Sequence, residues 1–186
     1  MGIRTSSETK LLDAAEELFF SRGISATPID TVIASAGVSP ATLYRGYASK
    51  DDLVAAVLSR RHDQWVTAWD DAIARGTTVS ERLLAVFDAL EEFRAHPHAA
   101  RWCAFLGTAA EYVEPPTGID EAVARDTETL RSRLTELAEP LGESRASTVV
   151  DDLLLLVTGY LAMRLRDPEH STATARRIAS GLLADL

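Results

Sequence analysis

Hydroxyl, phenol and cationic side chains gather in one short stretch of the chain, between Thr27 and Lys50. Such groups hold phosphate oxygens, and short side chains at the start of a helix can reach base edges in a DNA major groove. The candidate positions for contact with DNA are Thr27, Ser39, Pro40, Ala41, Thr42, Tyr44, Arg45, Tyr47 and Lys50. Among them, we expect Arg45 to make the strongest base or phosphate contact and Thr42 to meet a thymine methyl group or a base edge.

Two short helices joined by a tight turn would position these side chains. The first is predicted to have Thr27 as its cap and Pro28 as its first residue. It should end at Gly37, which tolerates a left-handed backbone. The second is predicted to have Ser39 as its cap and Pro40 as its first residue. This spacing is typical of a helix-turn-helix, whose second helix can enter the major groove.

The turn alone admits a second interpretation, because two short helices around an Ala-Gly-Val turn also form corners in proteins that never bind DNA. The residues that follow the turn favour the first. From Ala36 to Leu53 the chain reads AGVSPATLYRGYASKDDL. This stretch resembles the signature of the TetR family: A-G-V-S, two variable residues, L-Y, two more positions, an aromatic residue, then S-K-x-x-L. Further matches lie upstream, at Ala14, Ala15, Leu18, Phe19, Gly23, Thr27, Ile33 and Ala34.

The resemblance implies an all-α fold. An N-terminal three-helix helix-turn-helix domain would be joined by a long helix to a C-terminal helical domain that binds a ligand and dimerises. We place the DNA-binding domain at residues 1–48 and the ligand-binding and dimerisation domain at residues 49–186. The resemblance also implies that Lys50 binds a phosphate. The chain departs from the family pattern at Gly46, where members usually carry histidine or tyrosine, so one expected phosphate contact is missing.

The distribution of charge supports a DNA-binding head only in part. The net charge of the chain is −9, which taken as a whole opposes binding to nucleic acid. Residues 1–50 hold five basic and five acidic groups, whereas residues 51–186 hold 14 basic and 23 acidic groups. An acidic body would repel DNA and leave the neutral head as the contact surface.

Composition narrows the class of protein further. Of the 186 residues, 46% are hydrophobic, which is enough for a sizeable core. The sequence contains no run of 18 apolar residues, so we expect no membrane span. The N-terminal MGIRTSSETK lacks an apolar signal region, and a single cysteine, Cys103, fits a reducing compartment. We therefore expect a cytoplasmic protein.

No nucleophile–base pair, metal-ligand spacing or phosphate loop stands out, so neither an enzyme nor a cofactor is expected.

The rest of the chain has the pattern of an all-helical protein. A capping box at Thr5–Glu8 predicts a first helix that ends at Gly23, and a second box at Thr78–Glu81 opens a helix in the body. A long helix is predicted from Ser49 to Ala74. Further helical runs are expected at residues 98–112, 119–141, 149–165 and 173–186, the third of them apolar on more than one face.

Several aromatic side chains lie in the body helices, which the resemblance places around a central ligand cavity. Asp126 and Thr127 interrupt an apolar stripe where leucine or valine is expected, which predicts a polar pocket wall; a helix face turned toward water is the alternative. The candidate ligand-binding residues are Trp65, Trp69, Phe87, Trp102, Phe105, Tyr112, Asp126 and Thr127. For most of the aromatic residues an ordinary place in the core is the alternative. We expect an apolar or aromatic ligand, cationic because acidic residues dominate the polar candidates.

The last two predicted helices are expected to form a dimer interface, since the resemblance implies that two such helices per chain pair into a four-helix bundle. The candidate interface residues are Leu153, Leu156, Tyr160, Ile178 and Leu182. A two-fold dimer would set two recognition helices about 34–36 Å apart, the spacing needed to read a palindrome.

Two functions of different classes follow. The leading hypothesis is a dimeric transcriptional repressor that a small-molecule effector releases from a palindromic operator in double-stranded DNA, with no membrane contact. The alternative is a small-molecule binding protein whose head has lost DNA binding, a hypothesis that the neutral head and Gly46 keep open. An enzyme is a distant third.

Overall fold

The computed structural model describes residues 3–95 and 103–184, so the prediction made for Trp102 lies outside the described residues. Within these ranges the chain forms nine α-helices and one short 3-10 helix, with no strand, which confirms the all-α class. The chain divides into two compact units. The first contains Met1–Arg61 and Ala100–Ala124, and the second contains His62–Ala99 and Arg125–Leu186. The first unit is thus larger than a three-helix head.

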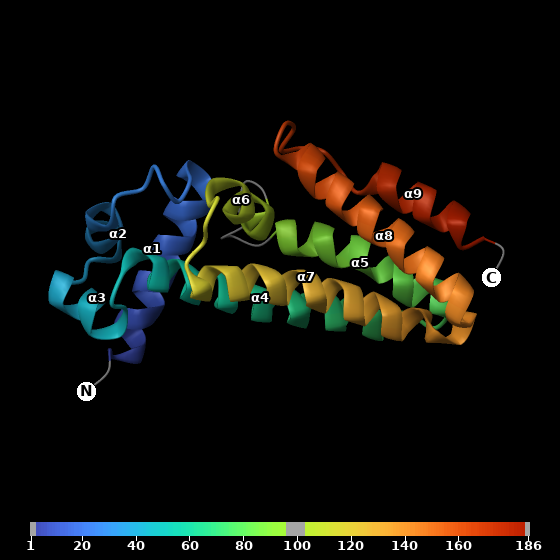
Figure 1. The fold of residues 1–186 in the computed structure, drawn as a ribbon, viewed down its shortest axis with the longest axis horizontal. Helices are drawn as coiled ribbons and strands as arrows, with labels where there is room; N and C mark the ends of the chain where they lie inside the picture. Colours follow the sequence, from blue (N-terminus) through green and yellow to red (C-terminus); the bar gives the residue numbers. More distant parts are fainter. Residues whose placement is uncertain (1–2, 96–102, 185–186) are drawn as a thin grey trace. The chain divides into compact units, whose positions relative to one another are not determined.

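The first unit is built around α1, which packs against both helices of the helix-turn-helix (Figure 1). Its complete helices are α1 (Thr5–Arg22), α2 (Ile29–Ala36), α3 (Pro40–Gly46) and α6 (Ala104–Glu111). The beginnings of α4 (Lys50–Ala74) and α7 (Thr117–Ala138) belong to it as well. Its core consists of buried apolar side chains, and those with at most 2% exposure include Leu11, Phe19, Phe20, Leu43, Leu53 and Leu58.

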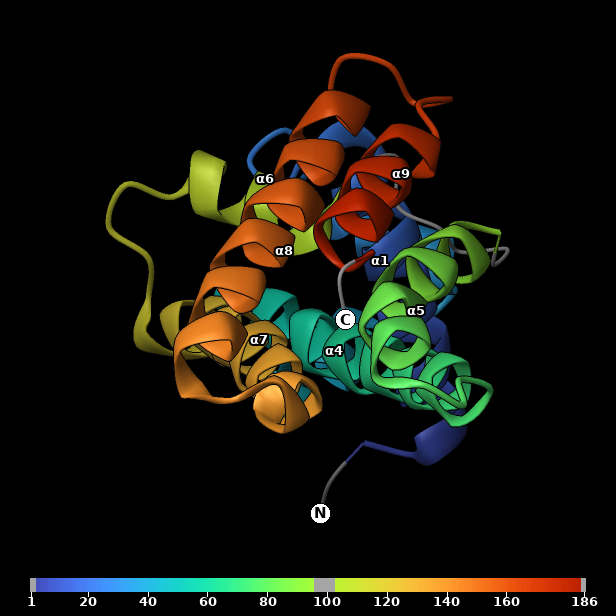
Figure 2. The same ribbon diagram turned by 90° about the vertical axis from the view of Figure 1, so that its right-hand side faces the viewer.

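The second unit contains the remainder of α4 and α7 together with the C-terminal helices (Figure 2). These are α5 (Val79–Arg94), the 3-10 turn η1 (Glu139–Leu141), α8 (Glu143–Arg164) and α9 (Ala173–Leu182). Helix α9 packs against both α5 and α8. In its core, the rings of Trp65 and Trp69 stack with centroids 5.5 Å apart, and Phe93 meets Trp65 edge-on at 5.8 Å. Such aromatic pairs add stability beyond the area they bury.

The helix ends follow the local sequence in most places. The Thr78–Glu81 capping box is present, with each side chain bonded to the backbone of the other residue. Ser49 Oγ accepts a hydrogen bond from Asp52 N at 3.0 Å, as a cap of α4. The capping box predicted at Thr5–Glu8 is wrong, because α1 begins at Thr5 itself and Arg4, the residue before it, makes no side-chain cap.

Helix α8 is the one described helix whose length and composition would suffice to cross a membrane. A third of its most apolar window is buried within the protein, and Val149, Val150, Leu153 and Val157 belong to the core of the second unit. Core helices pass the same test of length and composition, so α8 is weak evidence for a membrane span.

Candidate nucleic-acid interface

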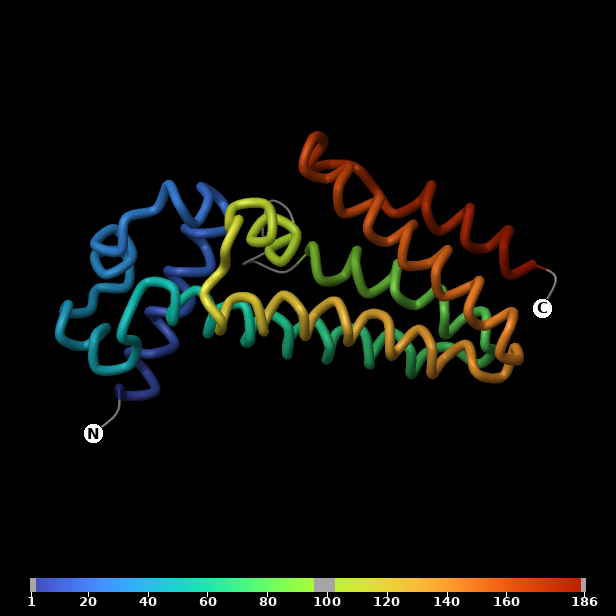
Figure 3. Tube along the Cα trace, in the orientation of Figure 1, coloured from blue at the N-terminus to red at the C-terminus, as the bar shows by residue number. Residues whose placement is uncertain are grey.

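The turn between α2 and α3 has the predicted geometry (Figure 3). Gly37 adopts φ 63° and ψ 34°, the left-handed conformation that ends α2, and Val38 N donates to Ile33 O at 3.3 Å. Ser39 then caps α3, since its Oγ accepts from Thr42 N at 3.1 Å, with Pro40 as the first helical residue. These contacts fix the direction in which α3 leaves the turn.

Helix α3 buries one side and presents the other to solvent. Leu43 is fully buried, whereas Tyr44 is 55% exposed and Ala41 and Arg45 are also exposed. Thr42 is half-buried, and its hydroxyl lies 2.9 Å from Ser39 Oγ. The predicted base-reading residues therefore share the solvent-facing side of a helix that its cap and Leu43 hold in place.

Thr27, predicted to cap α2 and to contact a DNA phosphate, has a different role in the structure. Its side chain is 1% exposed, and its hydroxyl donates to Gly23 O at 2.7 Å and Leu18 O at 3.3 Å. Its side chain does not cap α2, whose preceding residue is Pro28. The predicted cap is wrong, and a buried hydroxyl with two acceptors is not available to a phosphate. Thr27 instead holds the segment between α1 and α2 against the end of α1.

Tyr47 and Lys50 are engaged within the first unit. The Tyr47 hydroxyl donates to Glu8 Oε1 at 3.3 Å, which joins the end of α3 to the first turn of α1. Lys50 Nζ donates to Ile24 O at 2.5 Å and lies 5.7 Å from the centre of the Phe19 ring. Contact of these two side chains with DNA stays a prediction, and it would require that they exchange these partners for phosphate oxygens.

The contact between Tyr47 and Glu8 leads to a prediction for alkaline pH. Burial, followed by the Glu8 carboxylate, raises the pKa of Tyr47 from 10.0 to about 12. The folded protein therefore holds the phenol proton more tightly than the unfolded chain does. The stabilisation is complete below pH 10 and is lost as the pH rises toward 12. In urea unfolding, the stability advantage of wild type over Tyr47→Phe should decline between these pH values; a constant difference would contradict the shift.

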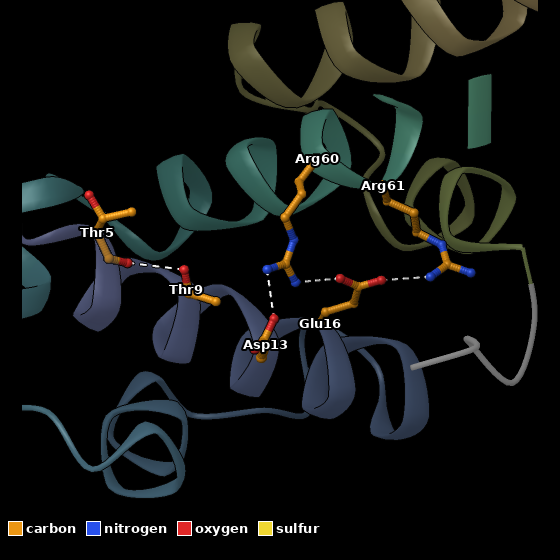
Figure 4. A network of polar contacts seen from close by, with 6 residues as sticks. All are labelled: Thr5, Thr9, Asp13, Glu16, Arg60 and Arg61. Atoms are coloured by element: carbon orange, nitrogen blue, oxygen red, sulfur yellow. Dashed lines mark hydrogen bonds and ion pairs between the residues drawn. The ribbon is translucent and has the colours of Figure 1, made fainter. Parts of the chain in front are cut away.

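A buried ionic cluster joins α1 to α4 inside the first unit (Figure 4). Glu16 is 2% exposed, and its carboxylate accepts from Arg60 at 2.5 Å and from Arg61 at 2.7 Å. Arg60 also bonds Asp13 at 2.7 Å. Sequence reasoning missed this cluster. The available signal was an acidic residue between Ala15 and Leu18 on the apolar side of α1.

A second set of bonds ties the end of α6 to the rest of the first unit. The Glu111 carboxylate accepts from Ile24 N at 3.1 Å and Ser25 N at 2.8 Å, in the loop that follows α1. The hydroxyl of Tyr112 donates to Asp51 Oδ1 at 2.8 Å, in the first turn of α4. Tyr112, predicted to bind a ligand, thus holds α4 in this structure.

The other predicted ligand-binding residues separate between the units. Phe105 is buried in the core of the first unit, whereas Trp65, Trp69 and Phe87 are buried in the core of the second. They make the ordinary core contacts that were the alternative for aromatic residues, and a role in ligand binding stays a prediction.

Asp126 and Thr127 on α7 were predicted to face inward together, and only one of them does. Asp126 is partly buried and lies 3.0 Å from Nδ1 of His62, a buried histidine whose Nε2 lies 3.3 Å from the Thr129 hydroxyl. Thr127 is exposed, so the expectation that both side chains face inward is wrong for it. Successive helical residues point about 100° apart, which is why one neighbour faces inward and the other does not. Sequence reasoning had given His62 no role.

The predicted dimer residues also divide by exposure. Leu153 and Tyr160 are 1% and 3% exposed and belong to the core of the second unit, so their prediction as interface residues is wrong for this structure. Leu156 is partly buried. Ile178 and Leu182 are each 42% exposed. Large apolar side chains that the prediction omitted are exposed on or just after α8: Leu155 at 73%, Met163 at 44% and Leu165 at 46%.

The N-terminal region of the chain matches a known protein family. A family model described as bacterial regulatory proteins, tetR family, matches residues 11–57, from α1 into α4. The chain is 37% identical over 93 residues to the HTH-type transcriptional activator FasR of Mycolicibacterium smegmatis. It is 31% identical over 94 residues to the HTH-type transcriptional repressor KstR2 of Mycobacterium tuberculosis. Each match covers 50% of this chain but only 42% and 47% of the relatives, less than half of their lengths.

The fold as a whole is similar to that of a solved protein. The crystal structure of SCO4454, a TetR-family transcriptional regulator from Streptomyces coelicolor, superposes with a TM-score of 0.87 and 29% sequence identity. The superposition covers 98% of this chain and 96% of that protein. The similarity therefore extends beyond the helix-turn-helix to the C-terminal helices.

Proposed function

Because this chain belongs to the TetR family of bacterial regulatory proteins, we propose that it is a homodimeric repressor released from a palindromic DNA operator by a small molecule. The observation that carries the proposal is the solvent-facing side of α3. Of the residues of this capped helix, only Leu43 is buried, and Ala41, Tyr44 and Arg45 are free of the core. A helix in this setting can lie in the major groove with its first turn against base edges.

Exposed apolar residues in the second unit support the dimer. Ile178 and Leu182 lie four residues apart on the exposed side of α9, and Leu155 and Met163 are exposed on the adjacent α8. Covering these side chains removes apolar surface from water, which favours association of two copies. In a two-fold dimer the same residues on each copy face one another.

Changing Ile178 and Leu182 together to aspartate should yield a monomer. Two buried carboxylates per subunit would have to lose their hydration at the interface, which costs several kcal/mol. Light scattering after size-exclusion chromatography measures the mass directly. The matched control is Thr67→Asp, at an exposed position on α4 in the same unit, and it should remain dimeric. A double variant that stays dimeric would exclude this face as the interface.

The ligand part of the proposal is supported by side chains of the second unit. The stacked Trp65 and Trp69 are 9% and 0% exposed, so a ligand would reach their rings only if the helices around them moved apart, and Asp126 supplies a partly buried carboxylate beside His62. These groups suit an aromatic or apolar molecule with positive charge. Thermal-shift screening tests the preference: stabilisation by anionic compounds alone would contradict the charge. Release from DNA requires that the ligand bind the DNA-free form more tightly than the DNA-bound form.

Selection of DNA from a random duplex library tests the proposed function. The purified protein, at two salt concentrations, should enrich a palindrome whose half-sites lie about one helical turn apart. The relatives include both kinds of regulator, since FasR is named an activator and KstR2 a repressor. Expression of a reporter gene placed behind the selected site therefore distinguishes activation from repression, and we expect the protein to lower expression. A folded dimer that enriches no sequence would instead favour a small-molecule binding protein.

A further inference from the structure

The departure from the family pattern at Gly46 has a structural counterpart. A Cβ atom built on Gly46 would lie 3.3 Å from Cγ2, 3.4 Å from Cβ and 3.5 Å from Cδ1 of Ile3. Three atoms of one side chain therefore occupy the space that a larger residue would fill. The absence of a side chain at position 46 lets the segment before α1 lie directly on the last turn of the recognition helix α3.

Neighbouring bonds fix this segment in place. Arg4 has extended backbone angles, φ −75° and ψ 138°, and its carbonyl accepts from Ser7 N and Glu8 N, both at 2.9 Å. Glu8 in turn accepts from the Tyr47 hydroxyl, immediately after α3. The backbone of Arg4 is thus held between the packed Ile3 and the first turn of α1.

The side chain of Arg4 is exposed and makes no hydrogen bond or ion pair with another side chain of residues 3–95 and 103–184. Arg45, next to Gly46 on α3, is exposed as well. Two cationic residues therefore flank the contact between Ile3 and Gly46, one from each segment. The one acidic group of the adjoining turn, Glu8, is shared with Tyr47.

The other cations of residues 1–50 lie elsewhere. Lys50 donates to Ile24 O. Arg22 is the last residue of α1, and the 17 steps of about 1.5 Å from Thr5 put it about 26 Å from the start of that helix. Lys10 lines a hollow on the side of α1 together with the acidic residues Asp13 and Glu17. Arg4 is therefore the cation best situated to reinforce the charge of Arg45 beside α3.

We propose that Arg4 binds a DNA phosphate beside the recognition helix, positioned by the packing of Ile3 against Gly46. This contact takes the place of the one that a histidine or tyrosine at position 46 would make. The inference rests on the proposed function, because it assigns a further contact to the same DNA interface. A phosphate contact strengthens binding to every sequence equally and makes it more sensitive to salt.

The test is fluorescence anisotropy on the selected duplex and on a scrambled duplex, with wild type, Arg4→Ala and the matched control Arg22→Ala. Losing one phosphate contact per subunit should lower the salt slope by about 1.8 for a dimer. The ratio of wild-type to R4A affinity should then be about 12-fold larger at 50 mM than at 200 mM salt. R4A should weaken binding to both duplexes by the same factor, and R22A should match wild type.

Ile3→Gly tests the positioning role. It should weaken binding less than R4A does, and it should cause no further loss when combined with R4A, because Ile3 acts through Arg4. Additive losses would overturn this role. A salt slope for R4A equal to that of wild type would overturn the phosphate contact, as would a loss confined to the selected duplex. If wild type itself does not prefer the selected duplex, the proposed function fails, which is a distinguishable outcome.

Discussion

Replacing Ala41 with glutamate should lower operator affinity about 100-fold or more while the protein stays folded. Ala41 is exposed in the first turn of α3, whose fully buried residue is Leu43. In the proposed complex each subunit would bring a carboxylate against the DNA phosphates, and a dimer does so twice. Folding should not suffer, because an acidic side chain in the first turn of a helix contributes about 0.3–1 kcal/mol of stability.

Anisotropy on the selected duplex measures this effect, with thermal unfolding as a check of the fold. The matched control is Ser144→Glu, which adds the same charge at the second residue of α8, again an exposed position. The control should keep wild-type affinity at equal ionic strength, since its charge lies on another helix in the second unit. Equal losses for both variants would mean that net charge, and not the position of α3, governs binding.

Replacing Glu16 with alanine should destabilise the protein by about 3–5 kcal/mol. Glu16 is 2% exposed and accepts from both Arg60 and Arg61, and the Arg61 side chain is itself only 9% exposed. Without the carboxylate, Arg61 remains buried with its nearest counter-charge removed. Loss of one partner of a buried pair costs far more than loss of a pair at the surface.

Urea unfolding followed by circular dichroism gives the measurement, and the midpoint should fall while the slope of the transition is kept. Asp13→Asn serves as the control, because Asp13 contacts the same Arg60 but its side chain is 41% exposed. Its cost should stay below about 1 kcal/mol. If Glu16→Ala were no more destabilising than Asp13→Asn, the cluster would not hold α1 to α4.

The features that sequence predicted well are those decided by residues close together in the chain. The Ser39 cap, the left-handed Gly37 and the Thr78–Glu81 box each depend on a few adjacent positions. Their hydrogen bonds span three to five residues, so the pattern of residue types contains the information that they need.

The features that sequence reasoning missed depend on distant partners. The Thr27 hydroxyl faces Leu18 O as well as Gly23 O, and the partners of Glu16 lie 44 and 45 residues further along the chain. The space beside the Gly46 backbone is occupied by the side chain of Ile3, which lies 43 residues earlier in the chain. No local pattern encodes such packing.

The prediction of Leu153 and Tyr160 as interface residues was wrong for a different reason. Helix α8 is apolar around most of its circumference, so hydrophobic periodicity does not indicate which side is core and which is exposed. Packing within the second unit decides this, burying Leu153 and Tyr160 and leaving Leu155 and Met163 outside.

Photo-crosslinking from α3 tests whether the start of this helix lies in a DNA major groove. A benzophenone side chain at position 41 is irradiated on the selected duplex, and position 144 carries the same group as the reference. Placement of α3 in the groove predicts adducts on bases within both half-sites from position 41 and none from position 144. An absence of base adducts from position 41 under conditions in which the protein is bound, or equal yields from both positions, would contradict it.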